Sequence, residues 1–159
     1  MATWTDEILI DGANLRLVAS ENGIRRISVG GSGAPEGRRD PGHPLLAEAA
    51  GQLRAYFAGE LREFRLPLDL AGTDFQLRVW RQLLTIPYGE TRTYNGIARA
   101  IGAPRAVRAV GAANGANPVL IVVPCHRVIG GNGKLVGYGG GIALKRRLLE
   151  LERGDGLFR

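Results

Sequence analysis

Residues 93–118, TYNGIARAIGAPRAVRAVGAANGANP, are the stretch that decides the architecture of the second half of the chain. They predict two short helices joined by a tight turn. Thr93 can cap the first helix, Gly102 can end it, and Pro104 can begin the second. The stretch is a helix-turn-helix pattern, although many helical hairpins bind nothing. Apolar residues on both helices supply the faces that pack: Ile97, Ile101, Val107 and Val110.

The charge distribution gives this pattern more weight. Residues 1–70 hold eight Lys and Arg and ten Asp and Glu, whereas residues 71–159 hold thirteen and five. From Thr91 to Leu149 there are nine basic residues and no acidic one. A solvated basic face is the simpler explanation, but so long a stretch without counter-charge favours a polyanion, most commonly nucleic acid. Arginines remain for the outside of the helix pair: Arg99, Arg105 and Arg108.

Two further helices flank this region. Thr73 and Gln76 fit a capping box, which begins a helix that Pro87 and Gly89 end. Residues 142–153, IALKRRLLELER, predict a helix that closes the chain. Its apolar residues are expected to face inward: Leu144, Leu148 and Leu151.

The segment between the helix pair and the closing helix is predicted to contain one strand. Residues 119–123, VLIVV, form a short apolar run suited to a buried strand. Pro124 ends this run, so Cys125 is expected at a strand end beside a core. Residues 130–141 are rich in glycine and predict a hairpin or loop.

Residues 1–70 predict a small domain that supports the second one. NLRLVAS, residues 14–20, and IRRISVG, residues 24–30, are strand-like runs. They surround an Asn22-Gly23 pair, which is a strong hairpin signal. No chemical motif stands out in this half of the chain.

The remainder of the first domain combines a loop, a helix and a short strand. Residues 30–43 are rich in Gly, Pro and Arg and predict a mobile loop. A helix is expected from Pro44 to Ala58, ended by Gly59. Residues 66–70, LPLDL, predict a short strand. The expected fold class is therefore α+β, with a mainly helical domain over residues 71–159.

The composition excludes several classes of protein. The chain is 45% hydrophobic and 23% charged, which is normal for a soluble globular protein. No apolar run approaches the length of a membrane span, and the first residues lack the features of a signal peptide. One cysteine cannot form an internal disulfide, so a cytoplasmic setting is expected. One cysteine and two histidines also argue against a structural zinc site.

The stretch VVPCHRVI, residues 122–129, holds that cysteine, Cys125, directly before His126. A lone cysteine is usually a small buried hydrophobe, but a nearby imidazole or positive potential favours thiolate over a free thiol of pKa about 8.5. A cysteine hydrolase would need the imidazole to face the thiol, whereas adjacent side chains on a strand point to opposite faces. A bridging water would then be required. A c-type haem site needs a second cysteine, which the chain lacks. The third alternative is a nucleophile that acts on DNA.

Four motifs, in this order and spacing, resemble the O6-alkylguanine-DNA alkyltransferases, also called methylated-DNA–protein-cysteine methyltransferases: IPYGETRTY, RAVGAANGANP, PCHRVI and GYGGG. The resemblance covers Gly72 to Glu152, and PCHRV in that setting is very specific. It implies repair of DNA by direct reversal, in which an alkyl group passes from O6 of guanine, or from O4 of thymine, to the protein's own cysteine. The product is a thioether, so each molecule reacts once and needs no cofactor or metal.

The resemblance implies roles for individual residues. Cys125 takes the alkyl group by in-line displacement, and His126, oriented by Glu152, draws off the thiol proton through a water. Tyr94 crowds the phosphate that rotates and donates its hydroxyl to guanine N3. Arg108 fills the gap that the flipped guanine leaves in the stack. Further contacts with DNA are expected from Thr91, Arg92 and Arg105.

The resemblance also implies a pocket for the flipped base. The carbonyls of Cys125 and Val128 accept from the guanine amino group, while Tyr138 and the Gly139 amide border O6. Asn117 ties its turn to the helix-turn-helix and braces the cysteine loop. In this family the recognition helix lies in the minor groove, where sequence readout is poor. The expected partner is double-stranded DNA carrying O6-alkylguanine, bound cooperatively by a protein that is a monomer in solution.

The chain departs from the family pattern at some positions, and simpler alternatives stay open. Gly139 stands where human-type members have a serine, and neither the zinc ligands of some members nor the extra cysteine for phosphotriester repair is present. Cys125 argues against the alkyltransferase-like proteins, which replace it. Glu152 could be a helix-end charge, Tyr138 plain packing, and Arg108 one phosphate contact among several. Two other classes remain from the residues alone, a non-catalytic DNA-binding module and a cysteine hydrolase acting on a small ester.

Overall fold

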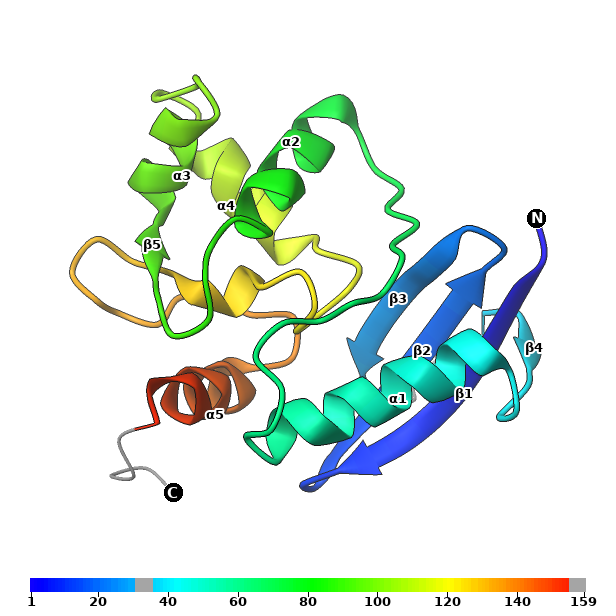
Figure 1. The fold of residues 1–159 in the computed structure, drawn as a ribbon. Coiled ribbons are helices and arrows are strands. Elements are labelled where there is room, and N and C mark those ends of the chain that lie inside the picture. Colours follow the sequence, from blue (N-terminus) through cyan, green and yellow to red (C-terminus); the bar gives the residue numbers. More distant parts are fainter. Residues whose placement is uncertain (31–35, 155–159) are drawn as a thin grey trace. The chain divides into compact units, whose positions relative to one another are not determined.

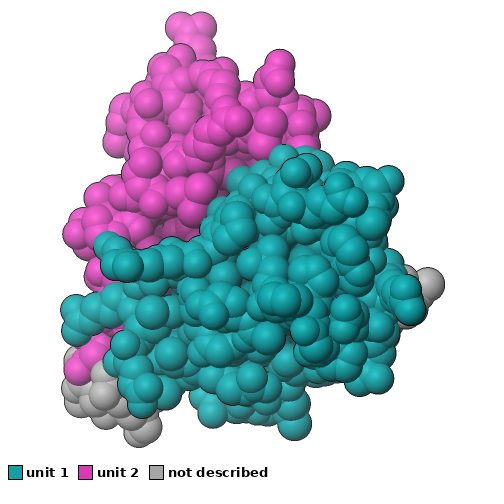
Figure 2. Space-filling view, turned by 45° about the vertical axis from the view of Figure 1, so that its right-hand side comes forward, with its two compact units in different colours: residues 1–71 teal, residues 72–159 magenta. Residues whose placement is uncertain are grey.

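The computed structural model describes residues 1–30 and 36–154. The chain divides into two compact units, Met1–Ala71 and Gly72–Arg159, which Figure 2 shows in separate colours. The first unit combines a sheet with one helix, and the second is mainly helical (Figure 1). The predicted α+β class is confirmed.

The first unit is a four-stranded sheet in the order β3-β2-β1-β4 with helix α1 packed on it (Figure 1). Strands β1 to β3 pair in antiparallel fashion, and the short β4 pairs in parallel with β1. The core of this unit includes side chains of β2, β3 and α1 that are almost completely buried: Leu15, Leu17, Ile24, Ile27, Leu46 and Leu53. The element bounds are β1 (Thr3–Ile10), β2 (Ala13–Ser20), β3 (Gly23–Val29), β4 (Arg38–Arg39) and α1 (Pro44–Phe57).

The hairpin predicted around Asn22 is confirmed, but Gly23 serves a different purpose. Glu21 and Asn22 form the turn, and Gly23 is the first residue of β3. A Cβ on Gly23 would lie 2.6 Å from the carbonyl oxygen of Pro67, so only glycine allows the two backbones to approach. The predicted strand at residues 66–70 is reduced to a single bridge to Ile24.

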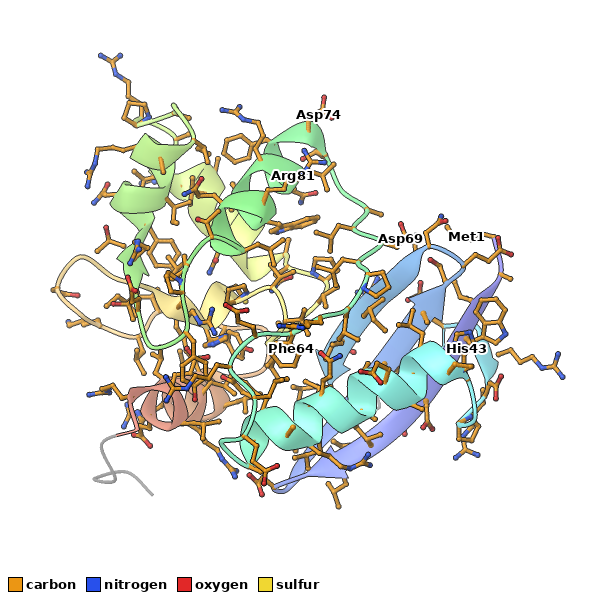
Figure 3. The ribbon with its side chains drawn as sticks, in the orientation of Figure 1. Met1, His43, Phe64, Asp69, Asp74 and Arg81 are labelled. Carbon is orange, nitrogen blue, oxygen red and sulfur yellow. The ribbon has the colours of Figure 1, made fainter. Side chains whose placement is uncertain are left out.

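The sequence analysis predicted neither β1 nor the short strand β4 before α1. Asp11 and Gly12, with φ of 51° and 80°, form the tight turn into β2. The predicted loop over residues 30–43 lies partly outside the described residues, and its described part contains β4. Helix α1 begins at Pro44 as predicted. His43, labelled in Figure 3, caps it by accepting from Leu45 N at 3.2 Å.

The second unit is a cluster of four helices around the cysteine segment. Trp80 of α2 is buried, and its indole nitrogen donates to the Ala113 carbonyl of α4 at 2.8 Å. Two very short strands, β5 and β6, pair in parallel, so Arg92 lies opposite Val128. The bounds are α2 (Asp74–Leu83), β5 (Arg92–Thr93), α3 (Tyr94–Ala100), α4 (Val107–Gly115), η1 (Cys125–Arg127, a 3-10 helix), β6 (Val128–Ile129) and α5 (Ile142–Arg153).

Most of the predicted helix ends are confirmed. Both halves of the capping box between Thr73 and Gln76 are present at the start of α2, where Asp74 follows (Figure 3). Thr93 Oγ1 accepts from Gly96 N at 3.0 Å and caps α3, and Gly102 has a φ of +75° after it. Two ends differ from prediction. α4 begins at Val107 because residues 104–106 form a turn, and α2 ends at Leu83, well before Pro87.

The prediction of a strand over residues 119–123 is wrong. The run is buried, but it forms tight turns, and Ile121 has a φ of +74°. The side chain of Asn117 takes the place of a neighbouring strand: its Oδ1 accepts from Val119 N at 3.0 Å, and its Nδ2 donates to the Val123 carbonyl at 2.8 Å. Apolar content predicts burial here, but the conformation depends on the asparagine that closes the turn.

Candidate active site

Cys125 begins the 3-10 helix η1 and is 2% exposed. Asn117 Nδ2, which shapes the preceding turn, also donates to Cys125 Sγ at 3.1 Å. Asn114 of α4 donates from Nδ2 to the Cys125 carbonyl at 3.4 Å. The two asparagines therefore fix the cysteine to α4 and to the turn that follows it.

The buried surroundings of Cys125 favour the neutral thiol over the thiolate at rest. Burial raises the pKa of Cys125 to about 11, although the hydrogen bond from Asn117 and the charge of Lys145 act in the opposite direction. Burial disfavours the charged form of a thiol unless strong compensation is present. Ionisation at neutral pH therefore requires a proton acceptor.

His126 is fully buried and is bound to Glu152, with 2.7 Å between Nε2 and Oε2. Burial lowers the pKa of His126, while the hydrogen bond and charge of Glu152 raise it. Nδ1 is also buried and has no hydrogen-bond partner within residues 1–30 and 36–154. The premise that adjacent side chains point to opposite faces does not hold here, because these two residues lie in a 3-10 helix rather than a strand.

Glu152 is the meeting point of several donors. Its Oε1 accepts from Arg127 Nε at 2.7 Å and from Gly89 N at 3.2 Å, and its Oε2 accepts from Arg127 Nη2 at 3.0 Å. Burial alone would raise the pKa of Glu152, but the hydrogen bonds and charges of His126 and Arg127 outweigh it and lower the pKa to about 2. The carboxylate is thus permanently ionised at neutral pH and can only accept. His126 Nε2 must then carry a proton, which leaves Nδ1 as the basic nitrogen.

A pocket of about 630 Å³ opens beside this cluster, between α3, α4 and the glycine-rich segment. The structure brings three predicted residues together on its wall: Tyr94, Tyr138 and Gly139. The hydroxyl of Tyr94 donates to the Val136 carbonyl at 3.1 Å, and burial raises the pKa of Tyr94. Burial likewise raises the pKa of Tyr138, whose hydroxyl has no partner in the described part of the chain. The predicted residue Val128 is buried and is not part of this wall.

The sequence analysis missed three residues that shape the site. Asn114 lines the pocket, Arg127 binds Glu152, and Lys145 is completely buried. Lys145 Nζ donates to the carbonyls of Val128 and Val136 at 2.6 and 2.9 Å, and burial lowers its pKa. Lys145 lies seven residues before Glu152 and therefore on the same face of α5, a periodicity that could have revealed it.

The residues predicted to contact DNA lie on the surface of this unit. The structure leaves all four exposed: Thr91, Arg92, Arg105 and Arg108. Arg92 makes an exposed ion pair with Glu90 at 3.2 Å. Of the nine basic residues between Thr91 and Leu149, only Arg127 and Lys145 are buried, and the other seven are exposed, as a surface that binds a polyanion requires.

No group of three or more His, Cys, Asp or Glu is arranged to hold a metal ion in residues 1–30 and 36–154. Over the same residues, no helix combines the length and the hydropathy needed to cross a membrane.

Comparison with known proteins identifies both halves of the chain. Residues 74–154 match the model of the 6-O-methylguanine DNA methyltransferase, DNA binding domain, and residues 13–70 match that of its ribonuclease-like domain. A methylated-DNA–protein-cysteine methyltransferase of Mycobacterium bovis is 68% identical over 114 residues, which is 72% of this chain and 68% of that protein. One of Methanosarcina barkeri is 59% identical over 111 residues, or 70% of each chain.

Solved structures agree over nearly the full length. The crystal structure of Mycobacterium tuberculosis O6-methylguanine methyltransferase has a TM-score of 0.88 and 52% identity, covering 97% of this chain and 94% of that one. The structure of Mycobacterium tuberculosis OGT in complex with DNA has a TM-score of 0.86 and 54% identity, covering 96% and 93%.

Proposed function

The chain belongs to the 6-O-methylguanine DNA methyltransferase family, and we propose that Cys125 is the residue that receives the alkyl group. The activity is that of a methylated-DNA–protein-cysteine methyltransferase, which repairs DNA by direct reversal through alkyl transfer to a cysteine of the protein. The observation that carries the assignment of Cys125 is that the only cysteine of the chain lies against Asn117, next to the His126–Glu152 pair.

The base that enters the pocket is a flipped O6-alkylguanine, with O4-alkylthymine as a second substrate. A base inside the duplex cannot reach a buried sulfur, and extruding it costs a few kcal/mol. The hydroxyl of Tyr94, which donates to Val136 in the structure, exchanges this acceptor for guanine N3 when the base enters. Tyr138 and the Gly139 amide border O6 on the same wall of the pocket.

The carbonyls proposed to accept from the guanine amino group already accept from donors of the protein. The Cys125 carbonyl accepts from Asn114 and from the backbone N–H of Val128, and the Val128 carbonyl accepts from Lys145. A carbonyl oxygen has two lone pairs, so the Val128 carbonyl retains a second acceptor position, whereas the Cys125 carbonyl exchanges the 3.4 Å bond from Asn114 for the base. Both carbonyls are thus held in place by buried donors before the base arrives.

The chemical step moves one alkyl group and one proton. The thiol proton passes to Nδ1 of His126 through a water, and the resulting imidazolium is stabilised by Glu152. Sulfur then attacks the alkyl carbon in line, the carbon–O6 bond breaks, and guanine leaves with the electron pair. Guanine takes up a proton from solvent, and the imidazolium of His126 releases its proton to solvent, so the step balances. A thioether at Cys125 has no leaving group that water could displace, so each molecule reacts once.

The DNA partner is held by the exposed arginines around α3 and α4. Arg108, which is exposed on the first turn of α4, fills the gap left by the flipped base, while the exposed residues Arg105, Thr91 and Arg92 face phosphates. Neutralised phosphates release counterions, which gives binding with little sequence preference. We expect a cytoplasmic protein that is monomeric in solution and binds DNA cooperatively.

The test is the mass of the protein after incubation with excess duplex carrying O6-methylguanine. The protein should gain one methylene, about 14 Da from the chemistry of methyl-for-proton exchange at a thiol, and peptide mapping should place it on Cys125. Cys125→Ser should gain nothing while still binding DNA. Repeated turnover without a mass gain would indicate a hydrolase, and an unmodified protein with unrepaired DNA would indicate a binding module.

A further inference from the structure

Arg127 is a buried cation that the proposed reaction does not use. Its side chain is 8% exposed and is held on three sides. Nε and Nη2 donate to the two oxygens of Glu152, Nη1 donates to the Ile86 carbonyl at 2.7 Å, and the guanidinium lies 5.8 Å from the centre of the Tyr88 ring. Such a two-pronged arrangement fixes both the position and the plane of a carboxylate.

The carboxylate of Glu152 therefore serves two cations at once, the guanidinium and any proton on His126. A lone carboxylate against a buried imidazole would favour the charged imidazolium strongly. A charged His126 could not take a proton from the thiol. The guanidinium offsets the carboxylate, so the burial of His126 keeps the imidazole neutral.

We propose that Arg127 is a positioning residue that holds Glu152 in one orientation and, by offsetting its charge, keeps His126 uncharged and ready to accept the thiol proton. This rests on the proposed role of Cys125 and His126 in alkyl transfer. In this proposal the arginine of the PCHRV motif controls the charge of the proton acceptor, His126, and does not contact DNA.

The other groups around His126 do not replace Arg127. Lys145 also carries positive charge and lowers the pKa of His126, but it ranks behind Arg127 in that effect, and its ammonium is bound to two backbone carbonyls. Tyr138 meets the imidazole edge-on, with 6.5 Å between ring centres, and Cys125 is a neutral thiol in the resting protein. Arg127, in contrast, donates directly to both oxygens of the carboxylate that orients His126.

The experiment measures the alkylation of Cys125 by iodoacetamide as a function of pH, without DNA. Because Cys125 is the only cysteine, loss of free thiol reports on it alone. In Arg127→Gln the charge is lost but a donor to Glu152 remains. The acid limb of the profile should move to higher pH by about one unit, since removal of a nearby cation raises the pKa of His126. Arg127→Lys retains the charge and should keep the limb within a few tenths of a unit of the wild type.

Arg81→Gln is the matched control, because Arg81 is an exposed arginine on α2 of the same unit (Figure 3), and its profile should coincide with that of the wild type. An Arg127→Gln limb at the wild-type position would overturn the proposal. Should that variant fail to fold, NMR titration of the wild-type imidazoles decides: the pKa of His126 should lie below the ordinary histidine value, and an imidazolium at neutral pH would contradict the proposal. Alkyl transfer to DNA plays no part in either readout, so failure here is distinct from failure of the proposed function.

Discussion

Two arginine–glutamate pairs in the second unit have the same chemistry and opposite surroundings. Arg92 and Glu90 meet at 3.2 Å with side chains 43% and 52% exposed, whereas Arg127 and Glu152 meet at 2.7 Å with side chains 8% and 1% exposed. Water screens the first pair, which should contribute less than about 1 kcal/mol. The second pair is desolvated, so each partner depends on the other to remain charged. The two pairs have the same residue types, so it is burial that makes the second pair a strong interaction within the site and leaves the first a weak surface contact.

The largest expected effect comes from breaking the buried pair. Glu152→Gln leaves Arg127 as a buried charge facing a neutral amide, which should lower the free energy of unfolding by about 3–5 kcal/mol. Glu90→Gln removes the exposed counterpart and should change it by less than about 1 kcal/mol. Urea titrations of both variants at pH 7 measure the difference. Equal losses would show that the two pairs are energetically alike.

The pH dependence of that difference sharpens the comparison. The folded pKa of Glu152 is about 2, below its ordinary value of 4.5. A depressed carboxyl pKa contributes stability that is complete above the unfolded pKa and is lost as the pH falls towards the folded one. The gap between wild type and Glu152→Gln should therefore narrow between pH 4.5 and pH 2. A constant gap over that range would point to a packing defect instead of a lost charge.

The sequence predicted the parts of the fold that local chemistry determines. The capping box at Thr73, the cap at Thr93 and the stop at Gly102 each depend on neighbours within a few residues, and each is present. The apolar run at residues 119–123 was misassigned because its conformation depends on the side chain of Asn117 rather than on its own periodicity.

The sequence motif predicted the central residues of the site but not the buried charges around them. PCHRV directs attention to Cys125 and His126, but the charge count treats Arg127 and Lys145 as surface residues along with the other seven. Their buried side chains bind to other segments of the chain, Ile86 for the arginine and Val128 for the lysine. The pKa of the Cys125 thiol was not predictable either, because burial by the folded chain, and not the neighbouring imidazole, has the largest effect on it.

A smaller effect is expected at the exposed arginines, where the charge acts on DNA. Arg108→Ala should reduce alkyl transfer from duplex DNA by about 10- to 100-fold, the equivalent of roughly 1.4–2.8 kcal/mol, and leave transfer from free O6-benzylguanine within a factor of about two. A free base needs no flipping, so only the duplex reaction loses the residue that fills the stack. Arg99→Ala removes one exposed charge from α3 and should not change this ratio. Equal losses of activity on both substrates for Arg108→Ala would show that Arg108 has no role in base flipping.

The smallest expected effect is on the salt dependence of DNA binding, and it compares one exposed arginine with one buried arginine directly. Each phosphate contact contributes about 0.9 to the slope of log affinity against log salt concentration on duplex DNA. Arg99 is exposed, so Arg99→Ala should lower the slope by up to that amount. Arg127 is bound to Glu152 and Ile86 and cannot reach a phosphate, so Arg127→Gln should leave the slope unchanged. Fluorescence titrations of both folded variants on an undamaged duplex at several salt concentrations provide the measurement. An equal decrease for both would mean that the arginine of PCHRV leaves its carboxylate when DNA binds, and that the buried pair is not a permanent part of the site.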